Sequence, residues 1–289
     1  MLSSLLSTRT PALFGRLDDD AWLQTILGTL TNRKARGVVL PGFPPETVQR
    51  NFVGSAGEHA LREGFGFYRV VRDALQRSGR PLTPATRVLD FGCGWGRMLR
   101  FFLREVSARN LHGVDVDPEM VAICRSQFGP LASFDVVPPM PPAPTLRDQY
   151  DVIYLYSVFS HLSQEVHLAW VEEFARRLAP GGLLLATTQG RRFLDFCESL
   201  RTGRPPESPW QQSLTRCFPD HADVVRRYDQ GEFLFAPTGG GEHRPSSFYG
   251  EAVVPRGFVE RSWPKSLSLV EFRDDPGFLP QALIVARRV

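Results

Sequence analysis

The sequence predicts an α/β fold, in which a doubly wound, mostly parallel sheet of seven strands ends in an antiparallel C-terminal hairpin. Two observations predict it. Between residues 86 and 188, short apolar runs alternate with segments of helical periodicity, which is the pattern of a parallel sheet covered by helices on both faces. Two more apolar runs, at 267–272 and 281–286, are joined by a turn sequence too short for a helix, so we expect them to be antiparallel neighbours.

The composition fits a folded protein with a sizeable core. The chain has 289 residues, and 42% of them are hydrophobic, which argues against global disorder. The net charge of +3 is too small to indicate a nucleic-acid surface, and no apolar run is long enough to span a membrane. The four cysteines form no C-x-x-C pair and no disulfide-scaffold spacing, so we expect a reduced, cytoplasmic protein.

Residues 1–80 are expected to form a helical N-terminal cap, set apart from a cofactor-binding domain over residues 81–289. Asp18–Asp20 precede an apolar pattern at 21–27 and predict a capped amphipathic helix. A longer helix is predicted over 57–76, because apolar residues recur there on one helical face. These residues are Leu61, Phe65, Tyr68, Val71 and Leu75.

The alternating part of the chain contains five predicted strands and the helices between them. Asp117 and Pro118 predict a helix start, with Asp as N-cap and Pro in the first turn. Ser163 is the expected N-cap of a later helix, which Pro180–Gly182 would end. The strands are expected at 88–91, 111–115, 133–137, 151–156 and 183–188. The helix that Pro118 starts is expected to run to 127, and one further helix is expected at 95–105.

Residues 190–250 do not continue the alternation of strands and helices and are interpreted as an insertion. They are rich in Pro, Gly, Arg and aromatic residues, so we expect a long irregular segment, which in a compact domain is usually functional. So many aromatic side chains argue against disorder. The insertion is expected to be a lid over a bound acceptor molecule. The alternative, in which the aromatic residues only pack the segment onto the sheet, stays open.

The segment from Arg87 to Arg97 has the form of a nucleotide-type cofactor site, with a strand, a tight glycine turn and the start of a helix. Glycine at positions 92 and 94 lets the backbone approach a ligand where a Cβ would collide. The dinucleotide fingerprint G-x-G-x-x-G would need its third glycine at position 97, whereas Gly96 comes one residue earlier.

Two acidic residues at strand ends complete this predicted site. Asp90, at the end of the first strand, is placed to accept from an ammonium group or to position a water. Asp115, at the end of the second strand, is placed to hold ribose hydroxyls, as in nucleotide-binding folds. Its alternative role, as N-cap of the next helix, is already filled by Asp117.

Four motifs in order resemble those of the class I S-adenosylmethionine-dependent methyltransferases. Asp90–Gly96 is similar to the first motif of that family and Gly113–Met120 to its second-strand motif. Tyr150–Leu162 is similar to the fourth strand and the loop after it, and Leu178–Leu185 to the approach to the fifth strand. The antiparallel C-terminal hairpin also fits that fold. The resemblance implies S-adenosyl-L-methionine as the cofactor and a Rossmann-like domain over residues 81–289.

The resemblance implies a role for each site residue by its position. The glycine turn would line the methionine part of the cofactor, and the end of the second strand would hold the ribose and pack on the adenine. The third-strand exit would meet the adenine edge, and the fourth-strand exit would form a wall of the pocket. In this order, the residues are Gly92, Cys93 and Gly94; Asp115 and Val116; Val136 and Val137; and Tyr156, Ser157 and Val158.

His161 is the leading candidate for a general base, because it follows the fourth strand at the sheet edge where open α/β sheets bind ligands. Its alternative role is a structural hydrogen bond near the start of the next helix. Weaker candidates lie in or beside the insertion, and they do not show the spacing of metal ligands. They are His221, Glu242, His243, Tyr249 and Glu251.

The sequence and the resemblance together predict a methyltransferase for a small-molecule acceptor, through O-methylation of a saccharide or secondary metabolite. No Asn/Asp-Pro-Pro-Tyr sequence and no Pro-Cys pair follow the fourth strand, and no basic stripe is interleaved with aromatic residues. We therefore expect neither a nucleic-acid nor a membrane partner. Two alternatives stay open, an NAD(P)-dependent oxidoreductase and a non-catalytic cofactor-binding protein. The acceptor atom and the oligomeric state also stay open.

Overall fold

The structure is a computed structural model that describes residues 9–289. Residues 1–8, the start of the predicted N-terminal cap, lie outside the described residues. The chain divides into two compact units. The first contains the chain up to Val137 together with Pro144–Tyr154, and the second contains Pro138–Ala143 together with Leu155–Val289.

Seven strands form one mostly parallel sheet. They are β3 (Val88–Phe91), β4 (Leu111–Asp115), β5 (Ser133–Val136), β6 (Tyr150–Leu155), β7 (Leu178–Thr188), β10 (Leu267–Arg273) and β11 (Ala282–Arg288), in the order β10-β11-β7-β6-β3-β4-β5. β3 is parallel to β4 and β6, and β4 is parallel to β5. β11 is antiparallel to both β7 and β10. The predicted fold class is therefore confirmed.

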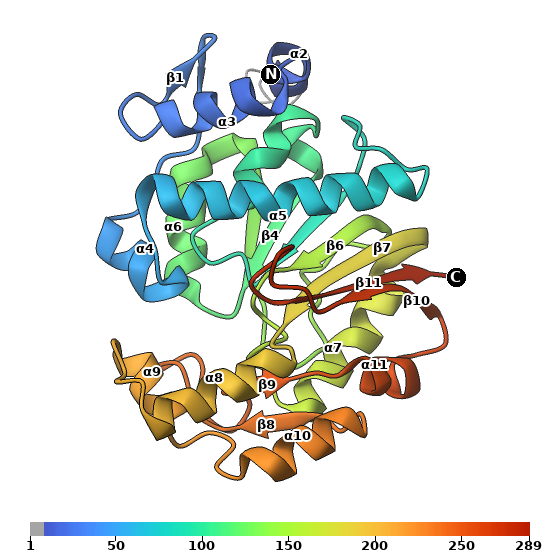
Figure 1. Ribbon diagram of the computed structural model, residues 1–289. Coiled ribbons are helices and arrows are strands. Elements are labelled where there is room, and N and C mark those ends of the chain that lie inside the picture. The colour runs from blue at the N-terminus through green and yellow to red at the C-terminus, as the bar shows by residue number, and fades with distance from the viewer. Residues whose placement is uncertain (1–8) are drawn as a thin grey trace. The chain divides into compact units, whose positions relative to one another are not determined.

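The rest of the first unit is mostly helical (Figure 1). The predicted apolar face of its longest helix, α5 (Gly57–Arg77), is buried as expected. Within residues 9–289, we find no helix with the length and apolar character needed to cross a membrane. The other elements are α2 (Arg9–Phe14), α3 (Asp19–Gly28), α4 (Glu46–Val53), α6 (Pro118–Phe128), the 3-10 helices η1 (Leu99–Arg104), η2 (Ala108–Asn110) and η3 (Gly129–Leu131), and the paired strands β1 (Lys34–Ala35) and β2 (Val38–Val39).

Three helices begin at the capping residues that the sequence indicates. Asp18 caps α3, Asp117 caps α6, and Ser163 caps α7 (Gln164–Arg177). Each side chain accepts a hydrogen bond from a backbone N–H of the first turn. Those N–H groups have no partner inside the helix, so the caps fix where each helix starts.

The prediction of an α-helix over 95–105 is wrong. The chain makes turns up to Met98 and then the 3-10 helix η1, in which the N–H of Phe101 donates to the carbonyl of Met98 at 3.1 Å. All six side chains of η1 are buried, including Arg100 and Arg104. Packing on every side of this segment overrides the local helical pattern, and the tighter 3-10 geometry results.

β7 is longer than the strand predicted at 183–188. It begins at Leu178, directly after α7, so Pro180–Gly182 lie within the strand and do not end the helix. Residues 183–188 are the part that pairs with β11. The sequence thus predicted the segment of β7 that carries the antiparallel ladder.

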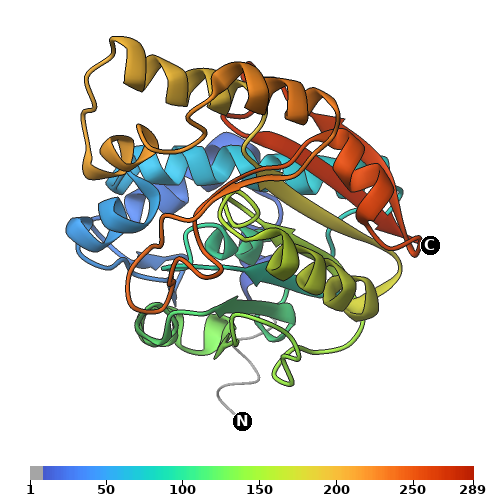
Figure 2. The same ribbon diagram turned by 90° about the horizontal axis from the view of Figure 1, so that it is seen from below.

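The insertion at 190–250 is more regular than expected. It contains α8 (Arg191–Thr202), α9 (Pro209–Leu214), α10 (His221–Asp229) and β8 (Leu234–Ala236), and it is followed by β9 (Glu251–Val253) and α11 (Arg256–Ser262). β8 and β9 are antiparallel partners. α8 and α10 lie side by side in both views of the molecule (Figures 1 and 2).

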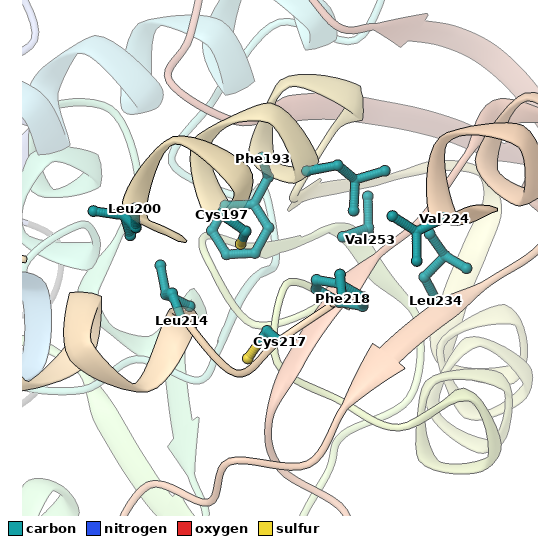
Figure 3. Close-up of a cluster of buried hydrophobic side chains, with 10 residues drawn as sticks. Phe193, Cys197, Leu200, Leu214, Cys217, Phe218, Val224, Leu234 and Val253 are labelled. Carbon is teal, nitrogen blue, oxygen red and sulfur yellow. The ribbon is translucent and has the colours of Figure 1, made fainter. Parts of the chain in front are cut away.

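The insertion has a hydrophobic core of its own (Figure 3). Buried side chains from three helices and two strands meet there, so much of its apolar content holds the insertion together. Trp210 is different, because 44% of its surface stays exposed. The core residues are Phe193, Leu194, Cys197, Leu200, Leu214, Cys217, Phe218, Val224, Leu234 and Val253.

Candidate functional site

The glycine turn after β3 uses three glycines in the left-handed region. Gly92, Gly94 and Gly96 have φ values of 74°, 50° and 76°, which residues with a Cβ rarely adopt. The N–H groups of Gly92 and Cys93 donate to the carbonyl of Val114 at 2.8 and 2.9 Å. These two bonds fix the turn to the end of β4.

Two helices of the first unit border the turn. Phe52 of α4 lies 3.6 Å from the place that a Cβ on Gly94 would take. Behind the turn, Arg97 donates to Glu63 of α5 at 2.9 Å. A Cβ on Gly64 of α5 would lie 3.2 Å from Arg97, so this glycine permits the close approach. Arg97, which breaks the dinucleotide spacing, is therefore a packing residue.

Gly96→Ala is expected to destabilise the protein by about 3 kcal/mol or more. A Cβ at this position would lie 2.5 Å from the ring of Phe128, and the backbone conformation is strained for alanine. Urea denaturation gives the free energy of unfolding. Gly79→Ala is the matched control, because Gly79 has a φ of 75° and open space around the missing Cβ. Equal losses in the two variants would contradict the steric role of Phe128.

Asp90 is a buried acid at the end of β3, with 3% of its surface exposed. Burial raises the pKa of this carboxyl to about 7. Its Oδ2 atom makes no hydrogen bond of good geometry among residues 9–289, and the hydroxyl of the buried Tyr154 is the neighbouring donor that lowers its pKa. A buried polar atom without a partner costs free energy, so Asp90 is well suited to accept from a bound ligand or an ordered water.

Asp115 ends β4 and holds the glycine turn with its side chain. Its Oδ2 accepts from the N–H of Gly94 at 2.8 Å, and its Oδ1 accepts from the N–H of Asp117 at 3.0 Å. These two bonds fix the carboxylate at the strand end, which is where nucleotide-binding folds hold ribose hydroxyls. Val116, the next residue, is half-buried.

Val136 and Val137 lie beside Asp115. Val136 is the register partner of Asp115, and the N–H of Val137 donates to the Asp115 carbonyl at 3.0 Å. Val136 is 41% exposed and Val137 is buried, so Val136 offers the apolar surface at this strand end. Oδ2 of Asp135 is hydrogen-bonded to Nε2 of the buried His112 at 3.0 Å.

Cys93 is a buried thiol within the turn. A hydrogen bond with Cys124 and burial raise the pKa of Cys93 well above its usual value. Cys93 therefore stays protonated at neutral pH and is not an activated nucleophile.

Arg100 is a residue of the site that sequence reasoning missed. It is fully buried, its guanidinium lies 4.2 Å from the ring centroid of Phe43, and it donates to the carbonyls of Gly42 and Gly96. Burial lowers the pKa of this group to about 9. Arg100 joins the loop before α4 to the glycine turn. An arginine in a local helical pattern gives no signal of such burial.

Tyr156, Ser157 and Val158 follow β6 and belong to the second unit. Ser157 has a φ of 59°, and its N–H donates to Oγ1 of Thr187 at 2.7 Å. The side chain of Gln281 donates to Ser157 Oγ at 2.9 Å and accepts from Thr187 Oγ1 at 2.7 Å. This polar network fixes the backbone where it leaves β6.

His161 is hydrogen-bonded to Gly250, at the end of the insertion. The N–H of Gly250 donates to the His161 carbonyl, and the ring Nδ1 donates to the Gly250 carbonyl, both at 2.8 Å. Tyr249 stacks on the imidazole, with ring centroids 4.8 Å apart. Because a carbonyl can only accept, Nδ1 carries the hydrogen and Nε2 keeps its lone pair. Burial lowers the pKa of His161 to about 4, so the ring is neutral at physiological pH.

Glu251 lies next to this histidine, although the two are far apart in the sequence. Its Oε2 is 3.8 Å from Nδ1 of His161, and its Oε1 accepts from the indole N–H of Trp210 at 2.8 Å. Burial raises the pKa of the Glu251 carboxyl to about 7. Of the weaker candidates, Tyr249 and Glu251 thus join His161, whereas His221 is bonded to Asp195 elsewhere on the insertion.

The predicted site residues fall into two groups, one in each unit. The group in the second unit is Tyr156, Ser157, Val158 and His161. The group in the first unit fits an adenosine-containing cofactor, because it combines a buried carboxyl at the end of β3, a turn of left-handed glycines and a carboxylate at the end of β4. It consists of Asp90, Gly92, Cys93, Gly94, Asp115, Val116, Val136 and Val137.

Comparisons with known proteins agree with this architecture. Residues 88–182 match the family model of a methyltransferase domain. A solved S-adenosylmethionine-dependent methyltransferase from Anabaena variabilis shares the fold, with a TM-score of 0.51, 16% identity and coverage of 89% of this chain and 100% of that one. Another from Clostridium acetobutylicum also has a TM-score of 0.51, with 11% identity and coverage of 77% of this chain and 91% of that one.

A curated relative is similar over part of the chain. Cyclopropane-fatty-acyl-phospholipid synthase of Escherichia coli is 28% identical over 115 residues, which are 40% of this chain and 29% of the relative. The match thus spans less than a third of that relative's length. Residues 88–182 thus form a methyltransferase domain, and S-adenosyl-L-methionine is its cofactor.

Proposed function

We propose that the protein transfers a methyl group to a hydroxyl of a small-molecule acceptor, a saccharide or secondary metabolite. The observation that carries this proposal is the state of His161. Its ring is neutral, its Nδ1–H is engaged by a backbone carbonyl, and Nε2 is an acceptor with no hydrogen bond among residues 9–289. A hydroxyl must lose its proton when it is methylated, so it needs such a group more than an amine does.

The residues of the first unit would hold the cofactor. Asp115 would accept from the ribose hydroxyls, and Val116, Val136 and Val137 would contact the adenine. Gly92, Cys93 and Gly94 would line the methionine part, and Asp90 would accept from its ammonium group or a water. When bound, the cofactor supplies a methyl group on a positively charged sulfur, which needs little further activation.

The second unit would bind the acceptor. Tyr156, Ser157 and Val158 would form a wall beside it, and His161 Nε2 would accept the hydroxyl proton. The insertion at 190–250 would be the acceptor lid, and the exposed ring of Trp210 supports this role, because a flat indole face can stack on a sugar or aromatic ring.

Several other predictions belong to the same proposal. We still predict a division at residue 80 into a helical cap and a cofactor domain. We also predict a cytoplasmic location and no nucleic-acid or membrane partner. The low net charge of +3 supports the view on nucleic acid.

A thermal-shift and methyl-transfer experiment tests the proposed function. S-adenosyl-L-methionine and its demethylated product are expected to raise the melting temperature, since a ligand that binds only the folded state stabilises it. NAD and NADP are expected to have no effect. Methyl-labelled cofactor with hydroxylated and amine acceptors then identifies the acceptor class. Stabilisation by NAD alone would favour the oxidoreductase, and transfer only to amines would contradict O-methylation.

A further inference from the structure

We propose that Glu251 is a positioning residue for His161 and that its carboxylate supplies the counter-charge when the imidazole takes up a proton. This inference rests on the proposed function, in which the acceptor hydroxyl gives its proton to Nε2 of His161. It explains how a histidine with a lowered pKa can act as a base.

The backbone holds the two side chains at a fixed separation. Besides the two bonds between His161 and Gly250, the N–H of Ala252 donates to the carbonyl of Ser160 at 2.8 Å. A Cβ on Gly250 would lie 2.1 Å from the carbonyl oxygen of Ala236, so only glycine permits this approach to β8. The residues before and after Glu251, Gly250 and Ala252, are therefore both hydrogen-bonded to the segment that carries His161.

The Glu251 carboxyl is held by one oxygen and unsatisfied at the other. Trp210 donates to Oε1, while the buried Oε2 has no hydrogen-bond partner among residues 9–289 and lies 3.8 Å from Nδ1 of His161. Only 2% of this side chain is exposed. A structural carboxylate in such a place is normally paired with a cation or several donors. Glu251 is instead aimed at a ring that becomes a cation only when it is protonated.

The charges explain why the pair is needed. Burial lowers the pKa of His161 to about 4, so the ring alone is a weak proton acceptor. When a proton arrives at Nε2, the ring becomes positive while Nδ1–H stays on the Gly250 carbonyl. A carboxylate at 3.8 Å favours that charged form. Burial raises the pKa of Glu251 to about 7, so this help increases as pH rises through neutrality.

Other titratable or charged groups face the pair, and they are Cys197, Cys217, Arg244 and the stacked Tyr249. Burial raises the pKa of Cys197 to about 12 and that of Cys217 to about 11, so neither changes charge near neutral pH. The Arg244 cation opposes protonation of His161. A change near pH 7 can therefore be assigned to Glu251.

The first test is an NMR titration of histidine-labelled full-length protein without ligand, with His161 assigned through the His161→Asn variant. The His161 signals of the wild type are expected to shift near pH 7, where Glu251 ionises, and again in acid, where the ring protonates. Glu251→Gln should lose the step near pH 7 and keep the acid step almost unchanged, because the wild-type carboxyl is already uncharged at the pH where the ring protonates. Trp210→Phe removes a donor that lowers the Glu251 pKa, so its step should move to higher pH.

The second test is the pH dependence of turnover with the acceptor found above. In the wild type, kcat is expected to rise through pH 7, whereas Glu251→Gln should have a flat profile and about tenfold lower kcat at pH 8. The KM for the acceptor should change little, because Glu251 acts through His161.

Stability measurements show whether the variant is folded and give a further check. The pKa of Glu251 is raised above its unfolded value, so the wild type is more stable in acid and loses that advantage as pH rises toward 7. Glu251→Gln removes this loss and should melt at a higher temperature than the wild type at pH 8. If Glu251→Gln does not fold, the Trp210→Phe titration decides.

A step near pH 7 that persists in Glu251→Gln, or no such step in the wild type, would overturn the inference. A pH dependence of kcat in Glu251→Gln equal to that of the wild type would also overturn it. If the titration behaves as expected but no acceptor is methylated, the His161–Glu251 pair stands and the proposed function fails. If O-methylation occurs without any effect of Glu251, the function stands and the inference fails.

Discussion

Asp115→Ala is expected to weaken the binding of S-adenosyl-L-methionine and of its demethylated product by about 2 kcal/mol, roughly a 30-fold change in Kd. The substitution removes two interactions at once. It removes the carboxylate proposed to hold the ribose, and it frees the N–H of Gly94 from a 2.8 Å bond that holds the glycine turn. Isothermal titration calorimetry on the purified protein gives the Kd of both ligands.

Asp117→Ala is the control for this experiment. Asp117 lies two residues further on and caps α6 with its side chain, while its own N–H donates to Asp115. Loss of the cap should lower stability by about 1 kcal/mol and leave the Kd nearly unchanged. An unaltered Kd in Asp115→Ala, or equal losses of affinity in the two variants, would refute the ribose assignment.

His161→Asn is expected to lower kcat about 100-fold, with a small effect on the KM of the acceptor. The asparagine amide can take the place of Nδ1 and still donate to the Gly250 carbonyl. It has no atom equivalent to Nε2, so it separates the loss of the proton acceptor from the loss of the anchoring bond. Single-turnover measurements with saturating cofactor give the rate of the chemical step.

His221→Asn provides the matched control, because it makes the same change at a histidine that is bonded to Asp195 on the insertion. Its kcat should equal that of the wild type. Wild-type turnover in His161→Asn would remove His161 as the base. A rise in KM with unchanged kcat would assign it to acceptor binding instead.

Local patterns predicted the cofactor half of the fold well. β3 and β4 have the predicted bounds, Val88–Phe91 and Leu111–Asp115, because short buried strands between turn signals have few alternatives. Asp117 caps α6 as expected, since capping depends on residues within one turn. The segment at 95–105 was predicted wrongly, because its 3-10 form comes from burial on all sides.

Long-range contacts set the limit of prediction. No local pattern links His161 to Gly250 and Glu251, which meet only because the chain returns after the insertion. The burial of Arg100 among backbone carbonyls and the ring of Phe43 also depends on segments that are distant in sequence. The regular helices of the insertion were hidden by its Pro, Gly and Arg content, which resembles that of a loop.

The separate core of the insertion has a consequence for how the enzyme can diversify. Phe193, Leu214, Phe218 and Val224 belong to one buried cluster, so residues on the outer surfaces of α8, α9 and α10 can be exchanged without disturbing that cluster. Substitutions on those outer surfaces therefore leave the core of the insertion intact. Under the proposed function, an insertion grafted from a related methyltransferase would change the acceptor preference, and the graft should keep Trp210 and Gly250, which contact Glu251 and His161.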